Sequence, residues 1–363
     1  IIMKHKTLLF YNPSFEKGGV EKNIINLLEN KGFTKDYNIK IISIDQFKFK
    51  KSSNVKFIIP KFYSYFVKNR LIKYLIAVIY LFIHSLKSEN VILSFQNNIF
   101  AILVTFFTKN KIIIRLNTAP KKYIMNNCSK KFFSFFYKKS DLVLCNSIYF
   151  KKDIKNYFGI NAIFFKNFLN VKVIEKLKKI KCNEPFLKAK NSLKLISIGR
   201  LVDQKNHIIL IKAAKLFKFK FKILIIGDGN QKESLLSLIK KNNLEKRIKI
   251  ISYTKNPYPY IFKSDIFVLS SKFEGMPNIL LEAAIIKTLI VSSDCPTGPK
   301  ELIQNKKTGF LFKNNSEKSL AKVMNKIYNK DNKKIINKIY ANIKKDYEIK
   351  KNINNFKELI NKI

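Results

Sequence analysis

Short apolar runs alternate along the chain with longer segments of helical character. In the first half the runs carry no polar alternation, which is typical of parallel strands buried on both faces. They occupy residues 7–11, 39–44, 91–95, 111–116 and 141–145. A second series occupies residues 193–198, 221–226, 247–251, 265–269, 289–292 and 310–312. The pattern predicts an α/β fold with two doubly wound, Rossmann-like parallel sheets that bind ligands at the carboxyl ends of their strands.

The two series predict two domains, and a chain of 363 residues is long enough for both. We predict an N-terminal domain over residues 1–185, a C-terminal domain over residues 186–343 and an amphipathic, Lys-rich helix over residues 344–363. The domains are expected to face each other across a cleft. The apolar stretch 74–83 is shorter than the roughly 20 residues that span a bilayer, so we interpret it as a buried helix.

The chain is strongly basic, with 71 Lys and Arg against 24 Asp and Glu and a net charge of +47. Such a balance suggests nucleic acid, an anionic membrane surface or a phosphate-rich ligand as partner. Four of the basic residues are Arg, namely Arg70, Arg115, Arg200 and Arg247. Lys therefore supplies the generic surface charge, and a retained Arg points to a position that needs a planar, bidentate guanidinium.

Cysteine usage and the N-terminal residues indicate the compartment. The four Cys residues have no paired spacing and no neighbouring His pair, so neither a zinc site nor a disulfide framework is expected. The apolar run 7–11 is too brief for the core of a signal peptide. We therefore expect a cytoplasmic protein without a bound metal.

Gly18 and Gly19 follow the first apolar run and open a helical segment. Adjacent glycines let the backbone approach a ligand closely, and the free N–H groups of a helix N-terminus attract anions. An ordinary turn between a strand and a helix is the alternative. Gly227 and Gly229 follow a later strand, but no third glycine completes a dinucleotide fingerprint, so we interpret them as a tight turn.

Gly199, Arg200 and Lys205 follow the first run of the second series. At the carboxyl end of a strand, Arg can bind a diphosphate through two parallel hydrogen bonds and Lys through its point charge. Each such charge-assisted bond contributes roughly 1.5–3 kcal/mol. Lys205 by itself would be one more surface Lys, whereas Arg200, scarce and placed after a glycine, favours a binding role.

The most specific motif is EGMPNILLE, which begins at Glu274 and ends at Glu282. Pro277 suits the first position of a helix, so Glu274 and Gly275 are expected in a loop that meets a helix N-terminus. Glu282 lies within an apolar run, where an unpaired carboxylate is costly to bury. A solvated position is the alternative for Glu282, but its neighbours favour contact with a ligand or a partner.

These motifs together resemble the retaining glycosyltransferases of family 4, also called group 1, which have the two-domain GT-B fold. The similarity covers nearly the whole chain and is strongest over residues 193–312. The family's signature of two Glu separated by seven residues matches Glu274 and Glu282. Its diphosphate-binding pair matches Arg200 and Lys205.

The resemblance implies a role for each matching residue. Glu274 would contact the donor sugar and act in catalysis with Arg200 and Lys205, and Glu282 would contact the ribose hydroxyls. The other implied donor-binding residues are Gly18, Gly19, Gly199, Gly275, Met276, Pro277 and Asn278. The resemblance also implies that the final helix crosses back onto the N-terminal domain.

The implied activity is transfer of a hexose or N-acetylhexosamine, with retention of configuration, from a nucleotide-diphosphate sugar such as a UDP-sugar. The acceptor would be a glycan or a lipid-linked glycan. The stretch DCPTGPKEL, residues 294–302, resembles the version found in bacterial transferases that build capsule, lipopolysaccharide and glycan chains. The nucleotide sugar is a co-substrate, so no cofactor is expected. In the family's front-face mechanism the leaving phosphate takes the acceptor's proton, and no metal is needed.

The chain departs from the family pattern at one place. Many members carry a His near the sugar in the N-terminal domain, and the matching segment of this chain has none. Arg115 and Asn117 stand in that segment. We consider them as candidates for the acceptor or sugar side of the site.

Two other classes of protein compete with this interpretation. A basic nucleic-acid-binding protein without enzyme activity is supported by the net charge alone, and four dispersed Arg without a binding motif argue against it. A Rossmann oxidoreductase would need the complete glycine fingerprint, which the chain lacks. We therefore expect no nucleic-acid partner.

Residues 130–139 interleave Lys with Phe, a composition suited to the headgroup region of an anionic membrane. The alternative is a helix whose Phe side chains are core and whose Lys side chains are solvated. Both interpretations stay open. A peripheral location on the inner face of the cell membrane is therefore considered beside a purely cytoplasmic one.

Overall fold

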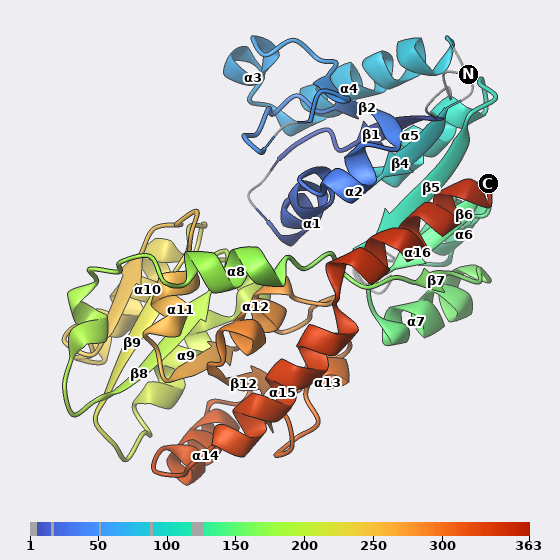
Figure 1. Ribbon diagram of the computed structural model, residues 1–363. Coiled ribbons are helices and arrows are strands. Elements are labelled where there is room, and N and C mark those ends of the chain that lie inside the picture. The colour runs from blue at the N-terminus through green and yellow to red at the C-terminus, as the bar shows by residue number, and fades with distance from the viewer. Residues whose placement is uncertain (1–5, 16–17, 51, 88–89, 118–125) are drawn as a thin grey trace. The chain divides into compact units, whose positions relative to one another are not determined.

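The computed structural model describes residues 6–15, 18–50, 52–87, 90–117 and 126–363. The chain divides into two compact units (Figure 1). The N-terminal unit combines residues up to Phe168 with residues 349–363, and the C-terminal unit consists of residues 169–348. Each unit contains a parallel sheet flanked by helices, so the predicted doubly wound α/β architecture is confirmed.

The described strands of the N-terminal unit form one parallel sheet. They are β1 (Lys6–Tyr11), β2 (Tyr37–Ile42), β3 (Val55–Phe57), β4 (Val91–Ser94), β5 (Lys111–Leu116), β6 (Leu142–Cys145) and β7 (Ile163–Phe164). Their order is β3-β2-β1-β4-β5-β6-β7. The order reverses beside β1, and sheets of this kind bind ligands at such a point. The strands β3 and β7, of three and two residues, were not predicted.

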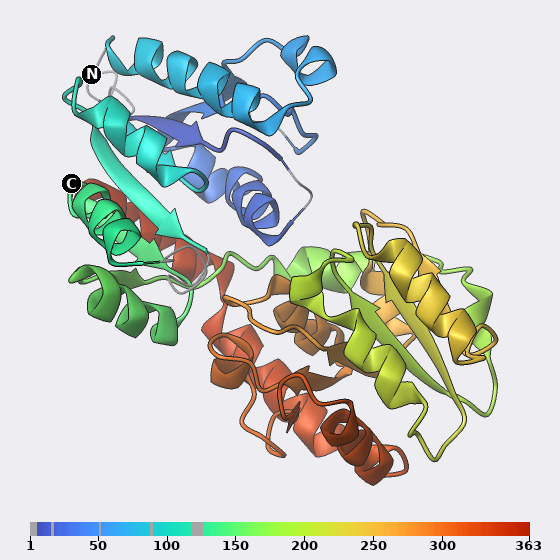
Figure 2. The same cartoon turned by 180° about the vertical axis from the view of Figure 1, so that it is seen from behind.

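Helices cover both faces of this sheet. Those described are α1 (Gly19–Leu28), α2 (Lys31–Thr34), α3 (Tyr63–Phe66), α4 (Arg70–Ser85), α5 (Asn98–Thr105), α6 (Asn127–Tyr137), α7 (Ile148–Phe158) and α16 (Ile349–Asn361). Successive strand residues point to opposite faces, so Leu8 and Phe10 pack with α1, α2 and α16, while Leu9 and Tyr11 pack with the side of α4 to α7. Figure 2 shows α4 and α1 on opposite sides of the sheet.

The C-terminal unit repeats this design with the strand order β10-β9-β8-β11-β12-β13. The described strands are β8 (Leu193–Ile198), β9 (Phe221–Ile226), β10 (Ile248–Ile251), β11 (Ile266–Leu269), β12 (Leu289–Ser293) and β13 (Phe310–Phe312). The order reverses between β8 and β11, which are parallel neighbours. The loops after these two strands therefore lie at the expected ligand-binding point.

The helices of the C-terminal unit also divide between the two faces of the sheet. One core includes residues of α8 (Val171–Leu177), α11 (Tyr258–Phe262), α12 (Asn278–Ile286) and α15 (Lys333–Asp346). The other includes residues of α9 (His207–Ala214), α10 (Lys232–Lys241) and α14 (Glu317–Ile327). The short helices are η2 (Pro185–Lys188), η3 (Asp203–Lys205) and α13 (Pro299–Leu302).

The structure moves both predicted boundaries. The units part after Phe168 rather than at residue 185, because Ile174 and Cys182 belong to a core of the C-terminal unit. The predicted helix 344–363 is two helices, since α15 ends at Asp346 and α16 begins at Ile349. The helix α16 belongs to the N-terminal unit, where Phe356 packs against the rings of Phe33, Phe165 and Phe168.

The interpretation of residues 74–83 as a buried helix is wrong for one side of that helix. They form part of α4, which buries Ala77 and Leu81 but leaves Leu75 and Ile79 exposed. Among the residues that the structure describes, none forms a helix with both the length and the apolarity needed to cross a membrane.

Replacing Phe356 with Ala should destabilise the N-terminal unit by about 3–5 kcal/mol, because a buried ring is lost and a cavity remains. Urea unfolding followed by circular dichroism measures the change. Phe107→Ala is the matched control, since Phe107 is exposed in the same unit, and it should change the free energy of unfolding by less than about 0.5 kcal/mol. Equal effects of the two substitutions would contradict the docking of α16.

Candidate active site

The candidate site of the C-terminal unit lies where β8 and β11 end side by side. The loop after β8 carries Gly199, Arg200 and Lys205, and the loop after β11 carries Ser271 and Glu274. Hydrogen-bond pairing of the two strands brings these loops to the same edge. Residues that are about 70 positions apart in the sequence therefore meet.

Lys205 and Glu274 form an ion pair at this edge. The Lys205 Nζ lies 2.5 Å from the Glu274 Oε1, and both side chains are largely buried. The hydroxyl of Ser271 donates to the same Oε1 at 2.6 Å. The Lys205 ammonium and the Ser271 hydroxyl both bind Oε1 and so orient the Glu274 carboxylate. Neither of them binds its Oε2.

Gln204 braces the two loops against each other. Its Nε2 donates to the Phe273 carbonyl at 3.1 Å, and its own carbonyl accepts the Lys272 amide at 2.8 Å. Arg200 is exposed beside this bridge, and its Nη2 lies 3.5 Å from the Gln204 Oε1. The geometry thus presents one exposed guanidinium and one buried ammonium at the same strand ends.

The glycines expected to make tight turns permit close backbone contact. A Cβ on Gly227 would lie 1.9 Å from the Gly199 carbonyl oxygen, so the turns after β8 and β9 touch. A Cβ on Gly298 would lie 1.6 Å from the Gly275 carbonyl oxygen. The neighbouring Thr297 hydroxyl donates to the Glu274 carbonyl. The segment 292–301 therefore packs against the loop of Glu274.

Helix α12 begins directly after this loop. Pro277 is its N-cap, one position before the predicted place, and Met276 and Asn278 are buried beside it. Glu282 is buried, with 2% of its surface exposed. Burial, followed by the charge of Glu282, raises the pKa of the Tyr258 phenol, which marks Tyr258 as a neighbour of that carboxylate. Sequence reasoning missed Tyr258, although it follows β10 at the same edge of the sheet.

His207 is a second residue that sequence reasoning missed. It opens α9, is buried, and its Nδ1 lies 3.2 Å from the Ser197 hydroxyl. Burial, with a further contribution from the charge of Lys205, lowers the pKa of His207 to about 4. The imidazole is therefore neutral at physiological pH. Its position directly after the Arg200–Lys205 loop was the available sequence signal.

Gly18 and Gly19 lie at the start of α1 in the N-terminal unit. The Gly18 amide donates to the Glu21 Oε2 at 2.9 Å, and Glu21 is buried. The expectation that this amide is free for an anion therefore differs from the structure. An anion at this turn would have to displace the Glu21 carboxylate, which sits three residues on and caps the helix.

Arg115 and Asn117 also belong to the N-terminal unit. Arg115 is buried, its Nη2 donates to the Asn167 Oδ1 at 2.6 Å, and its guanidinium lies over the Phe165 ring. The Asn117 Nδ2 donates to the Phe95 carbonyl at 3.0 Å. These contacts tie β5 to its own unit. The acceptor-side role of both residues stays a prediction.

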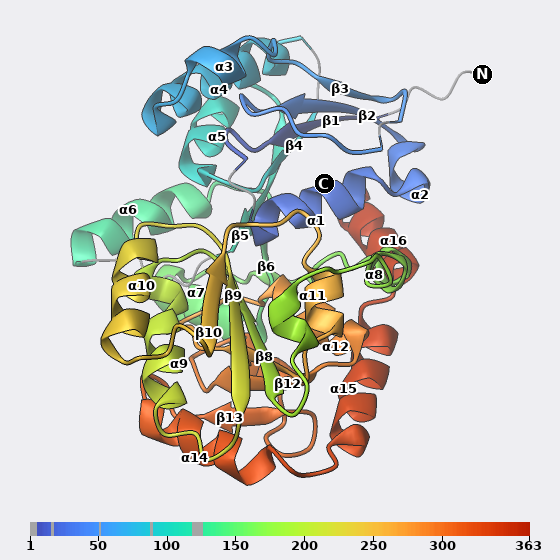
Figure 3. The same ribbon diagram turned by 90° about the vertical axis from the view of Figure 1, so that its left-hand side faces the viewer.

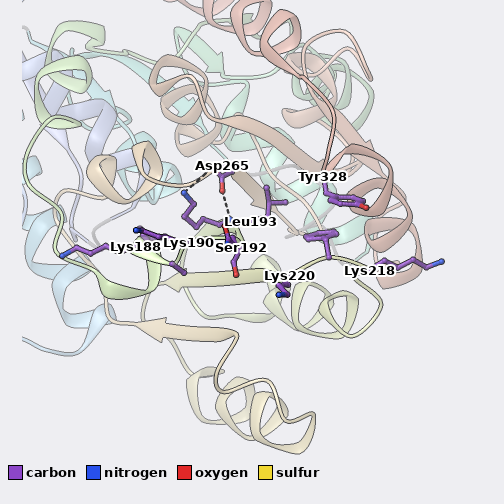
Figure 4. A pocket seen from close by; sticks show the side chains of 13 residues that line it. Lys188, Lys190, Ser192, Leu193, Lys218, Lys220, Asp265 and Tyr328 are labelled. Carbon is purple, nitrogen blue, oxygen red and sulfur yellow. Dashed lines mark hydrogen bonds and ion pairs between the residues drawn. The ribbon is translucent and has the colours of Figure 1, made fainter.

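A hollow of about 860 Å³ lies at the opposite end of the C-terminal sheet (Figure 4). It is lined by residues that precede β8, β9 and β11, among them Lys190, Lys220 and Asp265. Arg200, Lys205 and Glu274 follow the carboxyl ends of the strands instead. The hollow is therefore separate from the candidate active site.

Comparison with known proteins identifies the family of the C-terminal unit. Residues 178–346 match the family described as glycosyl transferases group 1. A Campylobacter jejuni protein, N-acetylgalactosamine-N,N'-diacetylbacillosaminyl-diphospho-undecaprenol 4-alpha-N-acetylgalactosaminyltransferase, is 32% identical over 238 residues. That match covers 64% of this chain and 64% of the relative, so the chain spans less than two thirds of the relative's length. An uncharacterised glycosyltransferase of Methanocaldococcus jannaschii is 36% identical over 179 residues, 47% of this chain and 44% of that protein. Residues 178–346 are therefore similar to the group 1 glycosyltransferases, and the predicted resemblance is confirmed.

Solved structures share the fold of the chain. HepE of Anabaena, in complex with UDP and glucose, matches with a TM-score of 0.80 over 99% of this chain and 100% of that one, at 15% identity. Sucrose-phosphate synthase of Thermosynechococcus elongatus matches with a TM-score of 0.81 over 99% of each chain, at 12% identity. At such identities the likeness concerns the fold, and the predicted GT-B architecture is confirmed.

The depressed pKa of His207 makes stability depend on pH. The folded unit keeps His207 neutral down to about pH 4, whereas in the unfolded chain His207 has its ordinary pKa of 6.5. Its contribution is complete above pH 6.5 and is lost as the pH falls towards 4. When the pH falls from 7.5 to 4.5, the free energy of unfolding should therefore decrease by roughly 2–3 kcal/mol less for His207→Gln than for wild type.

Urea unfolding of wild type and His207→Gln at both pH values measures this difference. For each protein, the free energy of unfolding at one pH is subtracted from its value at the other pH. A destabilisation by the substitution that is the same at both pH values therefore cancels. An equal loss of stability in the two proteins would show that His207 does not carry the pH dependence.

Proposed function

We propose that the protein is a retaining glycosyltransferase that moves a hexose or N-acetylhexosamine from a UDP-sugar to a glycan or lipid-linked acceptor in bacterial surface-glycan synthesis. The observation that carries the proposal is the Lys205–Glu274 pair. It lies where the strand order of the C-terminal sheet reverses between β8 and β11, within the residues that match the group 1 glycosyltransferases. In the proposed site Arg200 and Lys205 bind the diphosphate, and Glu274 contacts the sugar.

The donor is proposed to lie along the N-terminus of α12. Amides at the start of a helix favour a negative charge, so the diphosphate would lie near Met276, Pro277 and Asn278. Glu282 lies in the second turn of the helix and is proposed to accept hydrogen bonds from the ribose hydroxyls. The complex of HepE with UDP and glucose supports a UDP-sugar as donor.

The acceptor proposal rests on the relatives. The name of the Campylobacter jejuni relative contains a sugar linked to diphospho-undecaprenol. So does the name of an Escherichia coli galactosyltransferase that is 31% identical over 182 residues. A lipid-linked acceptor would place the reaction at a membrane surface, on the cytoplasmic side where the protein is proposed to act. Arg115 and Asn117 stay candidates for the acceptor side.

Departure of the nucleotide diphosphate is the proposed step that the site promotes. Arg200 and Lys205 would stabilise the negative charge that develops on the leaving phosphate, because charge-assisted donors act most strongly in a partly dry site. The acceptor hydroxyl would form its bond on the same face of the sugar as the breaking bond. Its proton would pass to the departing phosphate, so the proposed reaction needs neither a separate base nor a metal ion.

Glu274→Gln should lower kcat/KM for UDP-sugar turnover by about 10–100-fold, because one charged partner of the sugar and of Lys205 is lost. Radiolabelled donor turnover measures the rate. Glu184→Gln is the matched control, since Glu184 also pairs with a Lys in the same unit, at 2.9 Å, and it should leave the rate unchanged. Equal rates for wild type and Glu274→Gln would overturn the proposed site.

Chelation with EDTA should leave the rate of the purified protein unchanged, because Lys205 and Arg200 supply the positive charge at the phosphate. Added Mg²⁺ serves as the control and should not raise the rate. NMR of the product should show the anomeric configuration of the donor. Loss of activity on chelation, or an inverted anomer, would contradict the proposed mechanism.

A further inference from the structure

The outer side of α4 exposes more large apolar side chains than the helix buries. Leu71 is 70% exposed, and Leu75 and Ile79 follow at intervals of four residues, so the three lie on one face. Phe82, Ile83 and Leu86 continue the exposed side. Contiguous apolar surface of this kind marks an interaction site on a soluble protein.

The preceding helix α3 extends this surface. Phe62, Tyr65 and Phe66 are exposed there, and Phe66 is 80% exposed. We define the α3–α4 surface by these residues and the exposed apolar residues of α4. Figure 3 shows α3, α4, α5 and α6 following one another on one side of the N-terminal unit. Phe132 and Phe135 of α6 are exposed as well, so the segment 130–139 is only partly core.

Positive charge accompanies the apolar side chains. From Gln46 to Ser140 the sequence contains one acidic residue, Glu89. Exposed cations flank both helices, because Lys61 precedes α3, Lys68 and Arg70 stand at the start of α4, and Lys87 follows its end. The Arg70 guanidinium lies 5.4 Å from the Tyr74 ring centroid, an arrangement suited to a boundary between water and lipid headgroups.

Charge and helix length decide between the occupants of this surface. A second copy of the chain would bring the same positive charges together in a two-fold contact, which is unfavourable. The 16 residues of α4 are too few to cross a bilayer, but about 24 Å of helix can lie in the interface with its apolar side among the acyl chains. Anionic headgroups then match the flanking cations.

We propose that the α3–α4 surface docks the protein onto an anionic lipid bilayer, with Leu71, Leu75 and Ile79 inserted at the headgroup boundary. The inference rests on exposure and charge in the N-terminal unit alone and does not require the proposed activity. A lipid-linked acceptor would give the docking a use.

The absence of Trp from the sequence makes a reporter experiment simple. Ile79→Trp in the full chain should shift its fluorescence to shorter wavelength with vesicles of phosphatidylcholine and phosphatidylglycerol, and less with phosphatidylcholine alone. Leu236→Trp, at an exposed position of α10, is the matched control and should not shift. The same spectrum for Ile79→Trp with and without anionic vesicles would overturn the proposal.

A charge substitution tests the same surface without a reporter. Leu75→Glu with Ile79→Glu should lower co-sedimentation with anionic vesicles about tenfold, because two carboxylates would enter the interface. Leu216→Glu with Leu236→Glu, also exposed, should bind like wild type. Circular dichroism confirms folding, and UDP-sugar turnover without vesicles should be unchanged, which separates docking from activity.

Two results would overturn the assignment. Wild type that does not sediment with anionic vesicles at low salt, or a double variant that sediments like wild type, would exclude lipid docking by this surface. Sedimentation velocity without lipid provides the other check. A dimer of wild type that the double variant loses would assign the surface to a second copy of the chain.

Discussion

The ion pair between Lys205 and Glu274 is the contact on which the edge of the C-terminal unit depends. Removing an ammonium and a carboxylate from water costs several kcal/mol for each, and only good geometry with further hydrogen bonds offsets that cost. Ser271 supplies such a bond, and Gln204 holds the two loops together. The pair exists only because β8 and β11 are parallel neighbours, so the strand order determines the chemistry of the site.

The net charge of +47 has different meanings in the two units. In the C-terminal unit, Lys205 is largely buried against a carboxylate and Arg200 is exposed beside it, so single cations act at defined positions. In the N-terminal unit, cations flank the exposed apolar side of α3 and α4 in a segment that is nearly free of acidic residues. The groups that surround a Lys side chain, rather than the total count of Lys in the chain, decide whether it binds a ligand, faces a membrane or only keeps the protein in solution.

Several expectations failed where a local pattern has more than one structural solution. A ten-residue apolar stretch is compatible with a helix buried all round and with α4, which is exposed on one side. A glycine pair before a helix suggests free amides, but Glu21 reaches back to the Gly18 amide. No prediction was made for His207, because the burial that mainly lowers its pKa is set by the tertiary structure.

Apolar runs and turn residues predicted the two βα series, most of the strands and the loop around Glu274, because they report local burial and backbone geometry. Which charges meet could not be predicted in this way, since Lys205 and Glu274 are 69 residues apart and are brought together by the fold. The tertiary structure also decided which face of α4 is exposed and that α16 packs on the N-terminal unit. The physical reason is that ion pairing and burial depend on distance in space, which strand order and helix packing set and local sequence does not.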